Sequence, residues 1–187
     1  FSYISILMMV FMVVASQTGW ADDAALDTGD NAWILTSSAL VLLMTPGLAF
    51  FYGGMSSVKN INNMIMMVFL CMAIISVQWV FWGYTFSFGE DCGSFIGGMS
   101  MMGLHGITPD SLSGTLSEYT FVAFQATFAI ITVGLILGAV EGRMRFNACM
   151  LFIPLWATVC YDPVCHWVWG GGWAGNMGIL DFAGGTV

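Results

Sequence analysis

The chain has 187 residues, of which 58% are hydrophobic and only 7% are charged, and its net charge is −8. Soluble domains carry about 25% charged residues, so this composition excludes a soluble fold and indicates a membrane protein. With only three Lys and Arg residues in the chain, a nucleic-acid partner is also excluded, because phosphate contacts need clustered basic side chains.

The first expected element is an apolar run over residues 1–21, which ends in Gly19, Trp20 and Ala21. An apolar run followed by small residues is typical of a secretory signal peptide. The basic segment and the initiator methionine that normally precede such a run are absent, which indicates a sequence truncated at its start. An additional N-terminal span is the alternative, and we favour the signal peptide.

Four long apolar segments follow, each with the roughly 20 residues that are needed to cross a bilayer. They lie at residues 33–55, 63–88, 119–140 and 146–169. Lipid offers the backbone no hydrogen-bond partners, so segments of this length are predicted to be helices. A β-barrel would need shorter strands of alternating polarity. The predicted fold class is therefore all-α, a polytopic membrane helical bundle.

The few basic residues predict the orientation of these spans. Lys59 lies between the first and second spans, and Arg143 and Arg145 lie between the third and fourth. The other connecting segments contain acidic residues and no Lys or Arg. By the positive-inside rule the basic residues face the cytoplasm, so the first span begins outside. We expect a multi-pass protein of the cell membrane with an external N-terminus, which a cleaved signal peptide also requires.

Two sequence features within the spans predict details of their packing. Pro46 and Gly47 interrupt the first span, where proline removes a backbone hydrogen bond and kinks a helix. Gly134 and Gly138 form a G-x-x-x-G pair in the third span, which allows another helix to approach closely. These features indicate a tightly packed bundle and no particular activity.

Nothing in the sequence suggests an enzyme, because it contains no catalytic triad, phosphate-binding loop or metal-ligand cluster. The five cysteines match no zinc or redox spacing, and we expect neither a metal nor a cofactor. Cys92 and Cys165 lie near span ends on the same predicted side of the membrane, so the sequence leaves open whether they form a disulfide.

Three ordered motifs carry a resemblance to a known family. They are "DNAWILTSSALVLLMTPGLAFFYGG", "VAFQATFAIITVGLILGAVEGRMRF" and "HWVWGGGW" with "GILDFAGGTV". Together they resemble the ammonium transporter family (Amt/Mep/Rh), in its Amt branch, over residues 30–187. Members of that family have eleven spans in two inverted five-helix repeats and assemble as homotrimers. The resemblance implies that this chain is the first repeat, truncated at the start of a fifth span near residue 181.

The resemblance also assigns a recruitment site for ammonium. By its place in the motif "HWVWGGGW", Trp169 matches the family's recruitment tryptophan. The face of an indole ring attracts a cation by about 0.5–2 kcal/mol. An interfacial anchor is the alternative reading, which we assign to Trp167 and Trp173. Asp181 is expected to accept hydrogen bonds from the first amides of a following helix and to order the backbone at Ala183. Direct attraction of a cation is the alternative role for Asp181.

Other residues are assigned to the pore by the same resemblance. Phe128 matches a phenylalanine that closes the pore below the recruitment site, and Gln125 would support it from the same helical face. Phe51 and Tyr52 fall where the family lines the inner end of the pore. His166 lies outside the family's pore-histidine motif, so we interpret it as a hydrogen-bonded structural residue.

The implied function is transport of ammonium, which is recruited at the aromatic site, deprotonated and passed as ammonia through a hydrophobic pore. Methylammonium would be transported as an analogue of ammonium. The resemblance also leaves open whether a cytoplasmic regulatory protein of the PII type binds. The alternative is an ammonium-sensing receptor, in which the same membrane domain is fused to a signalling module. An unrelated helical membrane scaffold is a third reading.

Overall fold

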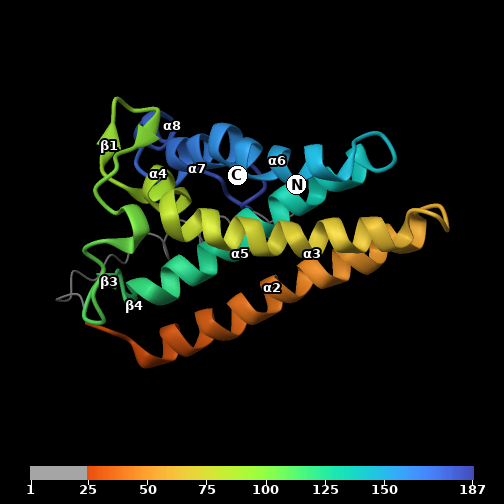
Figure 1. Cartoon of the computed structure of the whole chain (residues 1–187). Helices are drawn as coiled ribbons and strands as arrows, with labels where there is room; N and C mark the ends of the chain where they lie inside the picture. Colours follow the sequence, from red (N-terminus) through yellow and green to blue (C-terminus); the bar gives the residue numbers. More distant parts are fainter. Residues whose placement is uncertain (1–24) are drawn as a thin grey trace, which may run out of the picture.

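The computed structural model describes residues 25–187, and this part of the chain is mostly helical (Figure 1). Four helical segments are long and apolar enough to cross a membrane: Thr28–Met55, Ile61–Phe88, Glu118–Val140 and Phe146–Asn176. The prediction of an all-α membrane bundle is therefore confirmed. The predicted signal peptide at residues 1–21 lies outside the described residues.

Two of the long segments contain a π-helical turn, and a 3₁₀ turn lies in the connection between the second and third segments. In chain order the helical elements are α2 (Thr28–Met55), α3 (Ile61–Gln78), the π turn η1 (Trp79–Gly83), α4 (Tyr84–Phe88), the 3₁₀ turn η2 (Met102–Leu104), α5 (Glu118–Val140), α6 (Phe146–Trp156), the π turn η3 (Ala157–Tyr161), α7 (Asp162–Val168) and α8 (Trp173–Asn176). Two small antiparallel hairpins lie in the single connection between α4 and α5, for which the sequence predicts no strands. They are β1 (Asp91–Cys92) with β2 (Ile96–Gly97) and β3 (Leu112–Ser113) with β4 (Leu116–Ser117).

The helix α2 begins before the apolar run that predicts it. Its N-cap is Asp27, whose carboxylate accepts hydrogen bonds from the amides of Gly29 at 2.7 Å and Asp30 at 3.0 Å. A cap of this kind satisfies amides that have no partner within the helix. The helix therefore starts at a polar cap, whereas hydropathy alone starts the span at Trp33. It then continues without a break through Pro46.

Helix α3 is central, because it packs against α2, α5 and α6. Its buried face holds the apolar side chains of Met64, Met67, Val68, Cys71 and Ile75. Each of these side chains is at most 1% exposed. The core of the described bundle therefore follows α3.

Helices α2 and α5 cross closely at the predicted glycine pair. A Cβ atom at Gly138 would lie 2.7 Å from the Tyr52 ring, and one at Gly134 would lie 3.3 Å from the Leu48 side chain. Tyr52 also donates a hydrogen bond from its hydroxyl to the carbonyl of Leu135 at 2.8 Å. The predicted close approach at Gly134 and Gly138 is thus present, and α2 is the helix that makes it.

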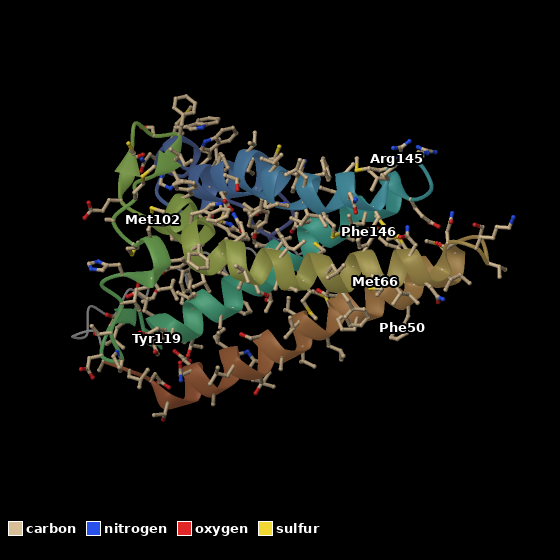
Figure 2. All side chains as sticks on the ribbon, in the orientation of Figure 1. Phe50, Met66, Met102, Tyr119, Arg145 and Phe146 are labelled. Carbon is tan, nitrogen blue, oxygen red and sulfur yellow. The ribbon has the colours of Figure 1, made fainter. Side chains whose placement is uncertain are left out.

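The connections that carry the basic residues lie together at one end of the bundle. Figure 2 shows Arg145 at this end, with Met102 and Tyr119 at the opposite end beside the hairpins. Ser56 donates a hydrogen bond to the carboxylate of Glu141, which joins the connection after α2 to the one after α5. All Lys and Arg residues of the described chain therefore lie at one end of the bundle, which is the arrangement that the positive-inside rule needs.

The sequence also predicts features of two cysteines and of the C-terminal segment. Cys92 is exposed, Cys165 is buried and both are free, so the disulfide that the sequence left open is not formed. Residues 181–187 contain a turn and no helix, so the expected fifth span stays a prediction.

The glycine contact predicts an asymmetric effect of substitution in the whole protein. Gly138→Val is expected to destabilise it by about 1–3 kcal/mol, because the new side chain would overlap the Tyr52 ring. Gly54→Val is the matched control, since within the described residues a Cβ atom there meets nothing within 4 Å. Thermal unfolding in detergent measures both, and equal losses of stability would contradict the close approach of α2 and α5.

Candidate functional site

The residues assigned by resemblance lie at three levels along the bundle. Trp169 ends α7 at the hairpin end, where α7 packs against α4 and β2 (Figure 1), and Asp181 follows α8 in the chain. Phe128 lies about 15 Å along α5 from the start of that helix at Glu118, given a rise of about 1.5 Å per residue. Phe51 lies near the far end of α2. The candidate residues therefore belong to different elements: α2, α5, the end of α7 and the segment after α8.

Trp169 is the residue at which α7 ends. Its backbone N–H still donates to the carbonyl of Cys165 at 2.8 Å, while the next residues leave the helix. Its side chain is half-buried and packs against the edge of the buried core. Gly170 then passes so close to α4 that a Cβ atom would lie 1.9 Å from the carbonyl oxygen of Ser87. Only glycine fits at this position, and its lack of a side chain lets the chain after Trp169 lie directly against α4.

Trp167 and Trp173 have a different environment from Trp169. The indole N–H of Trp167 donates to the carbonyl of Phe95 at 2.8 Å. Its ring lies 6.3 Å from that of Phe95 and 5.8 Å from that of Trp173, measured between centroids. Trp169 takes part in no such ring pair within the described residues. The indole of Trp167 thus contacts Phe95 of the hairpin, whereas the indole of Trp169 makes no such contact.

Asp181 holds a turn through its carboxylate. The carboxylate accepts hydrogen bonds from the amides of Thr186 at 3.1 Å and Val187 at 3.2 Å, and the backbone amide of Gly184 donates to the Asp181 carbonyl at 3.4 Å. Partial desolvation raises the pKa of this carboxyl, but the hydrogen bonds from Thr186 and Val187 outweigh that effect and lower it below the usual value. Ala183 lies within this turn and is exposed.

Phe128 belongs to an aromatic pair on α5. Its ring meets that of Phe124 edge to face, with a centroid distance of 4.9 Å and an interplanar angle of 89°. Both rings are half-buried. Gln125 lies on the same side of α5, and its buried Oε1 atom has no hydrogen-bond partner within the described residues.

Phe51 and Tyr52 both lie near the end of α2, but they contact different parts of the bundle. Tyr52 packs against α5, whereas Phe51 is 61% exposed and lines an apolar groove with Leu48 and Leu135. Their ring centroids are 5.9 Å apart.

A buried polar cluster, which the sequence analysis did not identify, joins the two π turns. Gln78 donates from Nε2 to Asp162 Oδ2 at 2.8 Å, and the indole N–H of Trp82 donates to Thr158 at 2.8 Å. Gln78 and Asp162 are at most 1% exposed. An ionisable side chain in a membrane span is costly and therefore a functional candidate by default. That signal, at Asp162, could have identified the cluster from the sequence.

His166 makes the hydrogen bonds that its structural role predicts. It is fully buried, with Nδ1 3.1 Å from the carbonyl oxygen of Ser87 and Nε2 3.2 Å from Asp91 Oδ1. The hydrogen bond from His166 is the main reason why the pKa of Asp91 is lowered. Stability from this contact is therefore present above the pKa of an unfolded Asp and is lost as pH falls through the lowered value.

Metal-binding chemistry finds no support in residues 25–187. No group of three or more His, Cys, Asp or Glu side chains comes together there in a way that could hold a metal ion. His105 is exposed on the connection between α4 and α5.

Comparison with known proteins gives one consistent match. The sequence model of the Ammonium Transporter Family matches residues 32–187. An ammonium transporter from Aquifex aeolicus (strain VF5) is 46% identical over 190 residues, which cover 99% of this chain and 43% of that protein. The chain therefore spans less than half the length of this relative.

Solved structures agree with the sequence match. The crystal structure of Candida albicans Mep2 is similar with a TM-score of 0.77 and 35% identity, over 86% of this chain and 36% of that one. A structure described as a sensor Amt protein is similar with a TM-score of 0.75 and 26% identity, over 82% of this chain and 39% of that one.

The contact between Gln78 and Asp162 predicts non-additive effects on stability. Gln78→Leu leaves Asp162 without its hydrogen-bond donor and is expected to destabilise the whole protein by about 1–3 kcal/mol. Asp162→Asn keeps an oxygen that accepts from Gln78, so it should cost less. Replacing both residues by leucine should cost less than the sum of the single leucine changes, because neither polar group is left unpaired. Thermal unfolding of the variants measures this, and strictly additive losses would contradict the pairing.

Proposed function

The chain belongs to the Ammonium Transporter Family, and on this premise we propose that the whole protein recruits ammonium at Trp169 and passes ammonia across the membrane. The observation that carries the proposal is the contrast between two neighbouring tryptophans. The ring of Trp167 is paired with Phe95 and Trp173, whereas the half-buried ring of Trp169 has no aromatic partner within residues 25–187. A half-buried indole face attracts a cation more strongly than an exposed one, because less water competes for it.

Deprotonation follows from the cost of moving charge into lipid. A bare ammonium ion in a low-dielectric interior is very unfavourable, and a buried ionisable group commonly sheds its proton instead. Ammonia is neutral and small, so it can pass an apolar constriction that excludes a hydrated ion. We propose that Phe128 forms this constriction, supported by its edge-to-face contact with Phe124.

Asp181 is proposed to act indirectly. Its carboxylate is occupied by the amides of Thr186 and Val187, so it orders the turn that contains Ala183. A carboxylate used in this way shapes the backbone beside the recruitment site without contacting the cation.

The remaining residues of the proposed path support its middle and its inner end. Gln125 offers a buried oxygen next to Phe128, and that oxygen has no partner within the described residues. Phe51 is exposed beside the apolar groove, and Tyr52 fixes α2 to α5. We propose that these residues line and support the inner half of the path.

An ammonium sensor is the second candidate function. The likeness to the structure described as a sensor Amt protein favours keeping it. A signalling module fused to the membrane domain of the whole protein, together with ammonium binding and no flux, would support sensing over transport. A homotrimer and a regulatory partner of the PII type are likewise proposals for the whole protein.

The position of the Lys and Arg residues at one end of the bundle predicts the orientation of the whole protein in the membrane. Single cysteines at positions 59 and 143 should be protected from a membrane-impermeant maleimide added to intact cells, whereas one at Asp110 should react. The test uses a background without other cysteines, and permeabilised cells control for reactivity. External labelling at position 143 would overturn the proposed orientation.

The proposed recruitment site predicts different effects for two tryptophans. Trp169→Leu should keep most apolar packing and lose the cation–π contribution, on the order of 1 kcal/mol or a several-fold higher half-saturating concentration. Trp167→Leu is the matched comparison. It removes a ring that contacts the hairpin and not the proposed cation site, so it should raise the half-saturating concentration less than Trp169→Leu does. The measurement is the concentration dependence of methylammonium uptake by the whole protein, normalised to folded protein in the membrane.

The same assay tests the proposed constriction. Phe128→Ala should change maximal flux and exclusion of other ions more than the half-saturating concentration. Equal losses of affinity at Trp167 and Trp169 would mean that these rings act through general packing, and the recruitment site would then be wrong.

A further inference from the structure

We propose that the β1–β2 hairpin, residues 91–97, positions Trp169 through the contact between Asp91 and His166. Asp91 is then a positioning residue for recruitment, and in this respect the inference rests on the proposed function. The hairpin belongs to the connection after α4, far in sequence from Trp169. No sequence motif identified above includes it.

The contact begins at His166, which is fully buried in the last turn of α7. Its Nδ1 atom lies 3.1 Å from the carbonyl oxygen of Ser87, and its Nε2 atom lies 3.2 Å from Asp91 Oδ1. A carbonyl oxygen only accepts, so Nδ1 carries the hydrogen of the first bond. A proton must also lie between Nε2 and Asp91 Oδ1 for the second. Both ring nitrogens are thus committed, and the ring is fixed from two sides.

Asp91 also shapes the hairpin with the same oxygen atom. Its Oδ1 accepts a hydrogen bond from the backbone amide of Ser94 at 2.6 Å. The turn needs this support, because Gly93 and Ser94 have φ angles of 77° and 67°, and a positive φ is uncommon for serine. The shape of the turn and the position of His166 are therefore coupled through one carboxylate oxygen.

Further contacts from the hairpin bracket Trp169 in the chain. The carbonyl of Phe95 accepts from the indole N–H of Trp167 at 2.8 Å, and the carbonyl of Ser94 accepts from the amide of Trp173 at 3.3 Å. The contacts at His166 and Trp167 precede Trp169, and the contact at Trp173 follows it. The half-buried side chain of Trp169 takes part in none of these hairpin contacts, whereas the chain on either side of it is held.

The hairpin is itself fixed to α4, so it can serve as a rigid support. Thr85 donates from its hydroxyl to the carbonyl of Gly98 at 2.6 Å. A Cβ atom at Gly97 would lie 2.3 Å from the carbonyl oxygen of Thr85, so β2 lies directly against α4. The positioning contacts therefore run from α4 through the hairpin to the end of α7.

The test compares Asp91→Ala with Asp91→Asn in the whole protein, with Asp110→Asn as a control for removal of an acidic charge from the same end of the bundle. Alanine removes the oxygen that joins Ser94 and His166, whereas asparagine keeps an acceptor for both. Hydrogen exchange of the amides at residues 166–173 reports how firmly the segment is held. The concentration dependence of methylammonium uptake reports recruitment.

The expected result has three parts. Asp91→Ala increases exchange at residues 166–173 and leaves exchange in α3 unchanged. It raises the half-saturating concentration roughly threefold with the maximal rate retained, the size expected for a residue that acts through another. Asp91→Asn keeps hydrogen exchange at residues 166–173 and the half-saturating concentration close to the wild-type values. Asp110→Asn changes neither quantity.

Unchanged exchange at residues 166–173 in Asp91→Ala would overturn the inference. Increased exchange with an unchanged half-saturating concentration would also overturn it, because the segment would then be held without effect on recruitment. If the wild-type protein neither binds nor transports ammonium or methylammonium, the proposed function fails, and the recruitment role of Asp91 fails with it. Increased exchange in that case would still assign Asp91 to holding the end of α7.

Discussion

Peptide groups inside a bilayer find no water, so each N–H and C=O needs a partner from the chain itself. Long helices satisfy this need along most of their length, and the remaining difficulty is at their ends and wherever the helix is interrupted. In this chain the interruptions are covered by neighbouring helices. The π turns η1 and η3 carry Trp82 and Thr158, which bond to one another, and the exit of α7 is pressed against α4 at Gly170.

The same constraint explains why polar side chains cluster between helices in this bundle. Gln78 and Asp162 face one another in the interior, where each is the other's partner. His166 is fixed between Ser87 and Asp91 nearer the hairpin end. The contacts of Gln78 with Asp162 and of Ser87 with His166 join the α3–η1–α4 segment to the η3–α7 segment, and the contact of Asp91 with His166 adds the hairpin. The two segments therefore act as one support for the chain that leaves α7 with Trp169.

That support gives the proposed recruitment site a physical basis. A tryptophan attracts a cation that lies over its ring face, and the attraction grows as water is removed from the site. Trp167 contributes its ring and its indole N–H to the hairpin, and Trp169 contributes neither. Two tryptophans separated by one residue thus differ in their contacts, because the hairpin accepts a hydrogen bond from only one of the two indoles.

The amino-acid sequence by itself determined the all-α membrane bundle, because length and hydropathy decide which segments can cross a bilayer, and the motifs indicated the family. Hydropathy did not locate the start of α2, which a polar cap at Asp27 decides. Sequence patterns also did not predict the π turns, the hairpins or the pairs Gln78–Asp162 and Asp91–His166. Each pair joins residues far apart in the chain, and local patterns carry no information about which distant side chain will meet another. Only tertiary packing decided those partners: the end of α3 meets the start of α7 at Gln78 and Asp162, and α7 packs against α4 and β2. The hairpin contact also decided the difference in environment between Trp167 and Trp169.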